Sequence, residues 1–319
     1  MRIDVDAWDP AYGAELETGG RGPAAQSDAQ LATDVEVPAD AWQPLVAAPD
    51  VRAPDTVLLV DGVRRIDAGV WVTDDATGDT HRGLAVSYAA GVVRCDLRAG
   101  YAEVAAARIA RGLFTPSPGA ESLSTGRITY TAHRVRGEEH LIDGVQAQLQ
   151  ALEVGVSEEA RAGSDDLLVV DGPLRSGRMH LPYVLGYVKT HRVEYLPREL
   201  STVVTQLRAG QRSPVFDLGS RWRRHAWYLR LPGTGGGPWA GVVRVECAAD
   251  LPVNRAVELA DLSAVTLPRF ASTPYKDPRA PQNLVPVAGL ERRLRGLLGD
   301  ARLLHRSLVL AARRPVPVP

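Results

Sequence analysis

Two aspartates that end nearly identical apolar segments are the first residues of this chain that could do chemistry. Asp61 follows Val57-Leu58-Leu59-Val60, Asp171 follows Leu167-Leu168-Val169-Val170, and a glycine comes directly after each aspartate. Short apolar runs of this kind predict strands buried on both faces. Asp-Gly is also a common pair in turns, so one copy alone is weak evidence for a functional aspartate. The repetition of the pattern is stronger evidence.

Open α/β sheets bind their ligands at the carboxyl ends of their strands. Two carboxylates held together at such an edge repel each other unless a cation lies between them. Mg²⁺ and Mn²⁺ prefer carboxylate and water oxygens as ligands. We therefore predict that Asp61 and Asp171 are catalytic acids that bind Mn²⁺ or Mg²⁺.

A third acid is expected from a helix between these strands. From Glu138 to about Glu159, apolar residues recur at helical spacing. Glu153 comes four residues after Leu149, at the edge of the apolar stripe, and is expected to face the sheet as the third catalytic and metal-binding acid. Glu159 falls at a similar angle and competes for the role. A solvated glutamate at the rim of the helix is the remaining interpretation.

The basic residues add a fourth candidate. Of the 37 lysines and arginines, only Lys189 and Lys276 are lysine. Because arginine is used almost everywhere else, a retained lysine indicates a position that needs a compact ammonium group. Chance retention is the competing explanation. Both lysines are candidates for such a position, and Lys189 ends the predicted strand at 183–189.

The elements that must position these residues follow the order of a ribonuclease H-like domain. In that fold, antiparallel strands follow the first strand, and a helix crosses to a parallel strand beside it, so the two aspartates would be neighbours. The chain is therefore predicted to be an α/β protein with a mixed sheet, flanking helices and a C-terminal helical segment. The predicted elements of this core are strands at 57–60, 69–72, 84–88, 167–170 and 183–189 and a helix at 138–159.

Other segments are predicted from composition and periodicity. Residues 1–50 are rich in Ala, Asp, Gly and Pro and are expected to form an extension that packs on the domain or binds a partner, with the main domain at 51–319 and regular structure from about Asp55. The remaining predicted elements are a helix at 102–113, a β-hairpin from 226–231 and 241–246, and C-terminal helices at 287–298 and 301–312.

Composition limits the class of protein. The chain is 45% hydrophobic and 24% charged, which is typical of a soluble globular protein, and it has no apolar run long enough for a membrane span. No signal-peptide pattern is present, Cys95 and Cys247 are expected to be reduced, and the cytoplasm is the expected compartment. The net charge is −1, so contact with a polyanion must come from local patches.

Two local patches are candidates for binding nucleic acid. Arg221 and Arg223 alternate with tryptophans, as in single-strand channels that combine phosphate contacts with base stacking. Solvated arginines at a strand edge are the alternative interpretation. Lys276 and Arg279 form the second patch, in a proline-rich loop. No phosphate-binding GxxxxGK[ST] loop is present, so an ATP-driven motor would have to be a separate protein.

In their order and spacing, these motifs resemble the NurA family of nucleases. The resemblance covers roughly residues 55–312 and implies a ribonuclease H-like DNA nuclease that uses manganese or magnesium. It matches Asp61, Glu153 and Asp171 to the metal-binding acids and Lys189 to a lysine that approaches the scissile phosphate. It also implies a homodimer that works on DNA ends with a HerA-type hexameric ATPase, in DNA repair or phage defence.

The chain departs from the family near its C-terminus. The family's Ala-His pair has no counterpart in the comparable stretch, 275–289, and Asp277 is the candidate replacement acid. The expected chemistry is phosphodiester hydrolysis by a two-metal mechanism. Two alternatives stay open: a catalytically inactive subunit that binds nucleic acid or a partner, and a hydrolase of RNA or of RNA–DNA hybrids.

Overall fold

The computed structural model describes residues 1–6, 25–26, 30–161, 166–175, 183–190, 193–219, 222–233 and 236–312. The strands are β1 (Arg2–Val5), β2 (Ala25–Gln26), β3 (Gln30–Ala32), β4 (Thr56–Thr73), β5 (Thr80–Asp96), β6 (Tyr101–Thr115), β7 (Leu123–Ser124), β8 (Thr129–Arg134), β9 (Leu167–Asp171), β10 (Val184–Val188), β11 (Val193–Glu194), β12 (Phe216–Gly219), β13 (Arg223–Arg230) and β14 (Val242–Ala248). The helices are α1 (Leu141–Ala160), α2 (Arg198–Gln206), α3 (Val253–Thr266), α4 (Val285–Leu297) and α5 (Ala301–Ala312).

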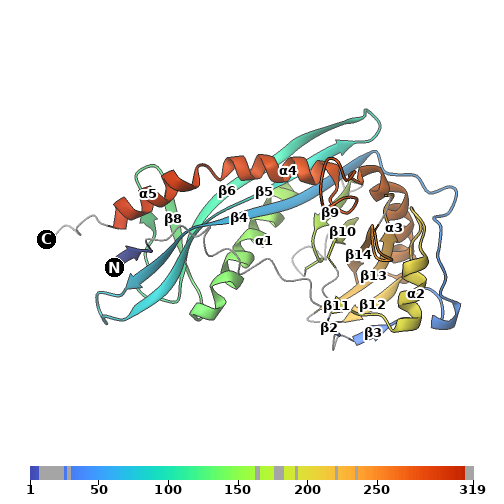
Figure 1. Ribbon diagram of the computed structural model, residues 1–319, viewed down its shortest axis with the longest axis horizontal. Helices are drawn as coiled ribbons and strands as arrows, with labels where there is room; N and C mark the ends of the chain where they lie inside the picture. Colours follow the sequence, from blue (N-terminus) through green and yellow to red (C-terminus); the bar gives the residue numbers. More distant parts are fainter. Residues whose placement is uncertain are drawn as a thin grey trace.

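Most strands join one large mixed sheet, in the order β3-β12-β13-β14-β10-β9-β4-β5-β6-β8-β7, with β1 also paired to β4. Its centre, β6-β5-β4-β9-β10, has the ribonuclease H-like order: β4, β5 and β6 are antiparallel, and β9 and β10 run parallel to β4. Helix α1 makes the crossover between β8 and β9 (Figure 1). The predicted fold class is confirmed.

Helices cover both faces of this central region. Along β4, successive side chains point to opposite faces, so Leu58 and Val60 pack with α1, whereas Leu59 and Val63 pack with α3 and α4. Figure 1 shows α4 and α5 running along the long strands β4 to β6, with α1 on the other side of them. The face to which a β4 residue points therefore decides which helix it meets.

The prediction that a strand ends at Asp61 is wrong. Strand β4 continues through Asp61-Gly62 to Thr73 and is paired with β5 along its length, with one irregularity between Ile66 and Ala68. The predicted strands at 69–72 and 84–88 are parts of these two long strands, and the predicted turn between them is present. The pairing of Asp61 with Gly91 and of Gly62 with Ala90 in this ladder overrides the turn preference of Asp-Gly, because it gives the backbone groups there hydrogen-bond partners.

The predicted helix at 102–113 is also wrong, because this segment forms β6. The alanine-rich sequence favours a helix locally, but propensity is weak beside long-range pairing. Strand β6 pairs with β5 from Asp96↔Tyr101 to Leu84↔Phe114, and buried Leu113 and Phe114 anchor its end. The segment lacks a helical apolar stripe: most of its first nine residues are exposed.

The N-terminal region contributes to the same sheet. Strand β1 pairs with β4, and β3 pairs with β12. Regular structure therefore begins well before Asp55, contrary to expectation, while the domain boundary at residue 50 stays a prediction. The predicted helices at 138–159, 287–298 and 301–312 are confirmed as α1, α4 and α5, and the hairpin of β13 and β14 is present; α2 and α3 were not predicted.

Both cysteines are buried and unpaired with each other, as expected. Among the described residues, no helix combines the length and the apolar character that a membrane span requires.

The packing of α4 on the sheet can be tested by cavity formation. Leu290 of α4 is 1% exposed, whereas Leu303 of α5 is 64% exposed. Leu290→Ala is expected to lower the free energy of unfolding by about 2–5 kcal/mol, because it leaves a cavity in the core. Leu303→Ala is expected to change it by less than about 0.5 kcal/mol. Urea unfolding measures both, and equal effects would contradict the packing described.

Candidate metal centre

The parallel pairing of β4 with β9 places the two predicted aspartates side by side. The ladder ends at Val60↔Val170, so Asp61 and Asp171 are the next residues on adjacent strands. Each comes two residues after a residue that packs on the α4 side, Leu59 or Val169, so both carboxylates lie on that side of the sheet. The prediction that these aspartates lie on neighbouring strands is confirmed.

The third acid of the cluster is Glu291 of α4. One carboxylate oxygen each from Asp61, Asp171 and Glu291 lie within 4.8 Å of one another. Glu291 was not among the residues predicted from the sequence, although its spacing in α4 gives a signal. Glu291 comes four residues after Val287, which packs on the sheet, and it is the only acid in α4. The spacing argument that selected Glu153 applies equally to Glu291.

The environment of Asp61 suits a bound cation. The residue is 9% exposed, and its Oδ1 accepts a hydrogen bond of 2.8 Å from the Gly62 N–H. Its Oδ2 is buried and has no hydrogen-bond partner among the described residues. Burial, together with the charge of Asp171, raises the pKa of Asp61 well above its ordinary value. A buried carboxylate oxygen that no donor satisfies costs free energy, and a divalent cation would satisfy it.

Lys189 lies in direct contact with this cluster. Its Nζ donates to Asp171 Oδ2 at 2.5 Å and to the Oδ1 of fully buried Asn283 at 3.0 Å. Burial raises the pKa of Asp171, and Lys189 offsets part of that rise. The rare lysine singled out from composition is therefore held at the site by two side chains.

Asp277, the predicted replacement for the family's histidine, lies outside the cluster of three acids. It accepts hydrogen bonds from Asn283 Nδ2 at 2.5 Å and from the Arg279 backbone N–H at 2.8 Å. The Arg279 guanidinium donates to both Asp277 and Glu291, with distances of 3.2 and 2.9 Å to the two Glu291 oxygens. Burial alone would raise the pKa of Glu291, but Arg279 outweighs it and lowers that pKa. Asp277 thus supports the arginine that keeps Glu291 ionised.

Glu153 faces the sheet, as expected, but from the other side. It is 9% exposed, and its carboxylate lies over Gly62, on the α1 face. Glu159 is 48% exposed and pairs with Arg108 at 2.8 Å. Of the two helix acids, Glu153 is the one that lies beside Asp61 along β4. Its role as a metal ligand stays a prediction.

The two Asp-Gly pairs have different structural causes. A Cβ at Gly62 would lie 2.5 Å from Glu153 Oε1 and 2.8 Å from Leu149 Cδ1, so a larger residue there would force these two α1 side chains to shift. Gly172 has a φ of 120°, a conformation that favours glycine. There the chain leaves β9, and the Gly172 N–H donates to the backbone carbonyl oxygen of Tyr187 at 2.8 Å. Only the second pair is the strand end that the sequence predicted.

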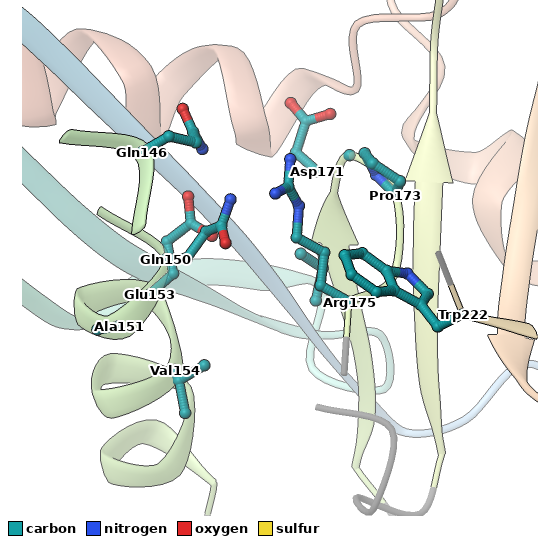
Figure 2. Close-up of a pocket in the computed structure, with 11 residues that line it drawn as sticks. Gln146, Gln150, Ala151, Glu153, Val154, Asp171, Pro173, Arg175 and Trp222 are labelled. Carbon is teal, nitrogen blue, oxygen red and sulfur yellow. The ribbon is translucent and has the colours of Figure 1, made fainter. Parts of the chain in front are cut away.

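A cleft of about 290 Å³ opens beside the cluster, between α1 and the segment that follows β9. Figure 2 shows Gln146, Gln150 and Glu153 on the α1 side and Asp171, Arg175 and Trp222 on the other, with the Asp171 carboxylate directed away from α1. The lining residues are Gln146, Gln150, Ala151, Glu153, Val154, Val170, Asp171, Gly172, Pro173, Arg175 and Trp222.

Of the described residues predicted to bind nucleic acid, only Arg279 is seen to contact the carboxylate cluster. Arg221 is outside the described residues, and Arg223 is exposed and pairs with Asp217 at 2.8 Å. Lys276 is exposed, with its Nζ 5.6 Å from the centre of the Tyr275 ring. Arg279 is engaged by the two carboxylates described above. Their contact with nucleic acid stays a prediction.

No protein-family model matches this chain, and no curated protein matches it. Among solved structures, it is similar to the Endonuclease V from Bacillus subtilis, with 11% identity, 79% of this chain and 86% of that chain covered, and a TM-score of 0.34. It is also similar to the catalytic domain of human Endonuclease V, with 17% identity, coverage of 76% and 84%, and a TM-score of 0.32. These TM-scores are too low to support a conclusion about this chain. The ribonuclease H-like fold is assigned from the strand order of the central sheet.

The buried charge of Asp61 predicts how stability responds to pH and metal. Because the folded-state pKa is raised, stability without metal falls as pH rises from the ordinary aspartate pKa toward that higher value. Asp61→Asn is expected to remove this loss and to raise Tm at neutral pH in EDTA. Mn²⁺ at about 100 times its Kd is expected to stabilise the native protein by about 2.7 kcal/mol and the variant by much less. A native Tm insensitive to Mn²⁺ would contradict the assignment.

Proposed function

We propose that this protein is a metal-dependent nuclease that hydrolyses phosphodiester bonds of DNA. The observation that carries the proposal is the unsatisfied, buried Asp61 Oδ2 within a cluster of three carboxylates. The cluster lies where β9 ends in a ribonuclease H-like sheet, the edge at which such sheets bind ligands.

Asp61, Asp171 and Glu291 would hold the metal, and Glu153 is the candidate for a further ligand from the α1 side. When bound, divalent metal ions activate a water molecule and stabilise the charge on the leaving oxygen, in a two-metal mechanism where two are present. The donor set of carboxylate oxygens fits Mg²⁺ or Mn²⁺.

The chain's own residues supply charge and orientation. Arg279 keeps Glu291 in the ionised form that binds a cation. Lys189 Nζ has three donors, two of which are used by Asp171 and Asn283. No other described residue bonds to this Nζ, so the remaining donor is available for a phosphate oxygen, and the ammonium would offset negative charge there as the transition state forms. Asn283 holds Lys189 in place, and Asp277 in turn fixes the Asn283 amide.

The finer assignment rests on the resemblance to the NurA family. It comprises action on DNA ends as a homodimer, with a HerA-type ATPase, in repair or phage defence. Within that assignment, Glu291 takes the place of the family's C-terminal histidine, because it is the C-terminal side chain that meets both aspartates. Asp277 has a supporting role instead.

Cleavage assays with matched variants test the proposal. With Mn²⁺ or Mg²⁺, the native protein is expected to cleave labelled DNA, and Asp61→Asn and Asp171→Asn are expected to lower the rate by at least about 100-fold, because even supporting residues of metal sites change activity by about 10- to 100-fold. Asp143→Asn on α1 is the control, since Asp143 is 80% exposed and outside the site.

Single-stranded DNA, duplex DNA, RNA and RNA–DNA hybrids are compared, with and without a HerA-type ATPase. No cleavage of any substrate would overturn the proposal in favour of an inactive binding subunit. Cleavage confined to RNA or hybrids would favour the RNA-directed alternative. If both aspartate variants keep native cleavage activity, Asp61 and Asp171 are not catalytic residues.

A further inference from the structure

The cleft beside the carboxylates has one polar wall and one flat, largely apolar wall. The polar wall is formed by the α1 amides Gln146 and Gln150, and the other wall by Pro173 and Trp222 (Figure 2). At about 290 Å³, the cleft lies at the lower end of the range for small-molecule sites.

The flat wall is held in place by hydrogen bonds. Trp222 Nε1 donates to the Leu174 carbonyl oxygen at 3.2 Å. The Leu174 N–H donates at 2.9 Å to Glu246, which is fully buried and also bonded to Arg244. The indole ring is therefore fixed before any ligand arrives. A fixed aromatic ring beside a phosphate-binding site is the usual surface on which an unpaired base stacks.

The polar wall belongs to a chain of hydrogen bonds that crosses the cleft. Arg64 Nη1 donates to Gln146 Oε1 at 2.7 Å. With the Gln150 amide oriented so that its oxygen accepts, Gln150 receives hydrogen bonds from Gln146 at 3.2 Å and from Arg175 Nη1 at 2.7 Å. Amide groups read the hydrogen-bonding edge of a base, and the two arginines place positive charge at both ends of the chain.

We propose that this cleft binds the base of a single unpaired nucleotide whose phosphate lies at the carboxylates. The base stacks on Trp222 and bonds to Gln146 and Gln150, while Arg175 exchanges its bond to Gln150 for the neighbouring phosphate. The inference rests on the proposed nuclease function, because Glu153 and Asp171 line the same cleft. A base enters such a site only when it is unpaired, so single-stranded DNA is the preferred substrate.

An abasic scan tests the proposal. Single-stranded oligonucleotides that carry one abasic residue at successive positions are cleaved with Mn²⁺. One position relative to the cleaved bond is expected to reduce the rate by between about 5- and 150-fold, the value of one stacked base. Trp222→Ala is expected to lower the cleavage rate on intact DNA by the same factor. In this variant, an abasic residue at the sensitive position is expected to cause no further decrease in rate. Trp222→Phe is expected to keep a rate close to that of the native protein, because phenylalanine can still stack on a base. Trp71→Ala, at a 42% exposed tryptophan on β4, is the control.

A binding measurement separates failure of the cleft from failure of the function. In EDTA, an oligonucleotide containing 2-aminopurine is expected to show a fluorescence change with the native protein that Trp222→Ala abolishes. If cleavage depends on metal but its rate is the same at every abasic position, the cleft proposal is wrong and the proposed nuclease function is retained. A Trp222-dependent signal without any cleavage would overturn the nuclease and leave a nucleotide-binding cleft. A signal unchanged by Trp222→Ala would overturn the cleft proposal.

Discussion

The candidate site depends on three carboxylates that the fold brings close together between the central sheet and α4. Asp61 and Asp171 sit on adjacent parallel strands, and α4 brings Glu291 against both. Three carboxylates this close repel one another strongly where water is excluded. Two neighbouring cationic side chains reduce that repulsion. Lys189 pairs with Asp171, and Arg279 pairs with Glu291. Among the described residues, no cation pairs with Asp61, and under the proposed function a divalent cation at its buried Oδ2 would complete the charge balance.

The alternation of side chains along β4 organises the rest of the site. Asp61 faces α4, and the next residue, Gly62, faces α1 and lets the Glu153 carboxylate approach the strand. The acids therefore come from both faces of the sheet and converge where β9 ends, since Asp171 and Glu153 line one cleft. A substrate that reaches this edge can meet both groups without entering the core.

The sequence predicted the parts of the fold that local patterns determine. The apolar runs before Asp61 and Asp171, the periodicity of α1 and the order of the elements led to the correct central sheet. The length of β4 and the strand at 101–115 depend on pairing with β5, which no local pattern records. The position of Glu291 beside the apolar stripe of α4 can be read from the sequence, but the packing of α4 against the two aspartates cannot. Lys189 was found because its residue type is rare in this chain.

The central claim is that Glu291 shares a metal ion with Asp61 and Asp171. The most direct test is Mn²⁺ binding by isothermal titration calorimetry to the native protein and to two matched variants, Glu291→Gln and Glu159→Gln. We expect Glu291→Gln to weaken binding by at least about 10-fold. Glu159, which is half exposed and paired with Arg108, is expected to be replaceable without effect. Native-like Mn²⁺ affinity in Glu291→Gln would contradict the account.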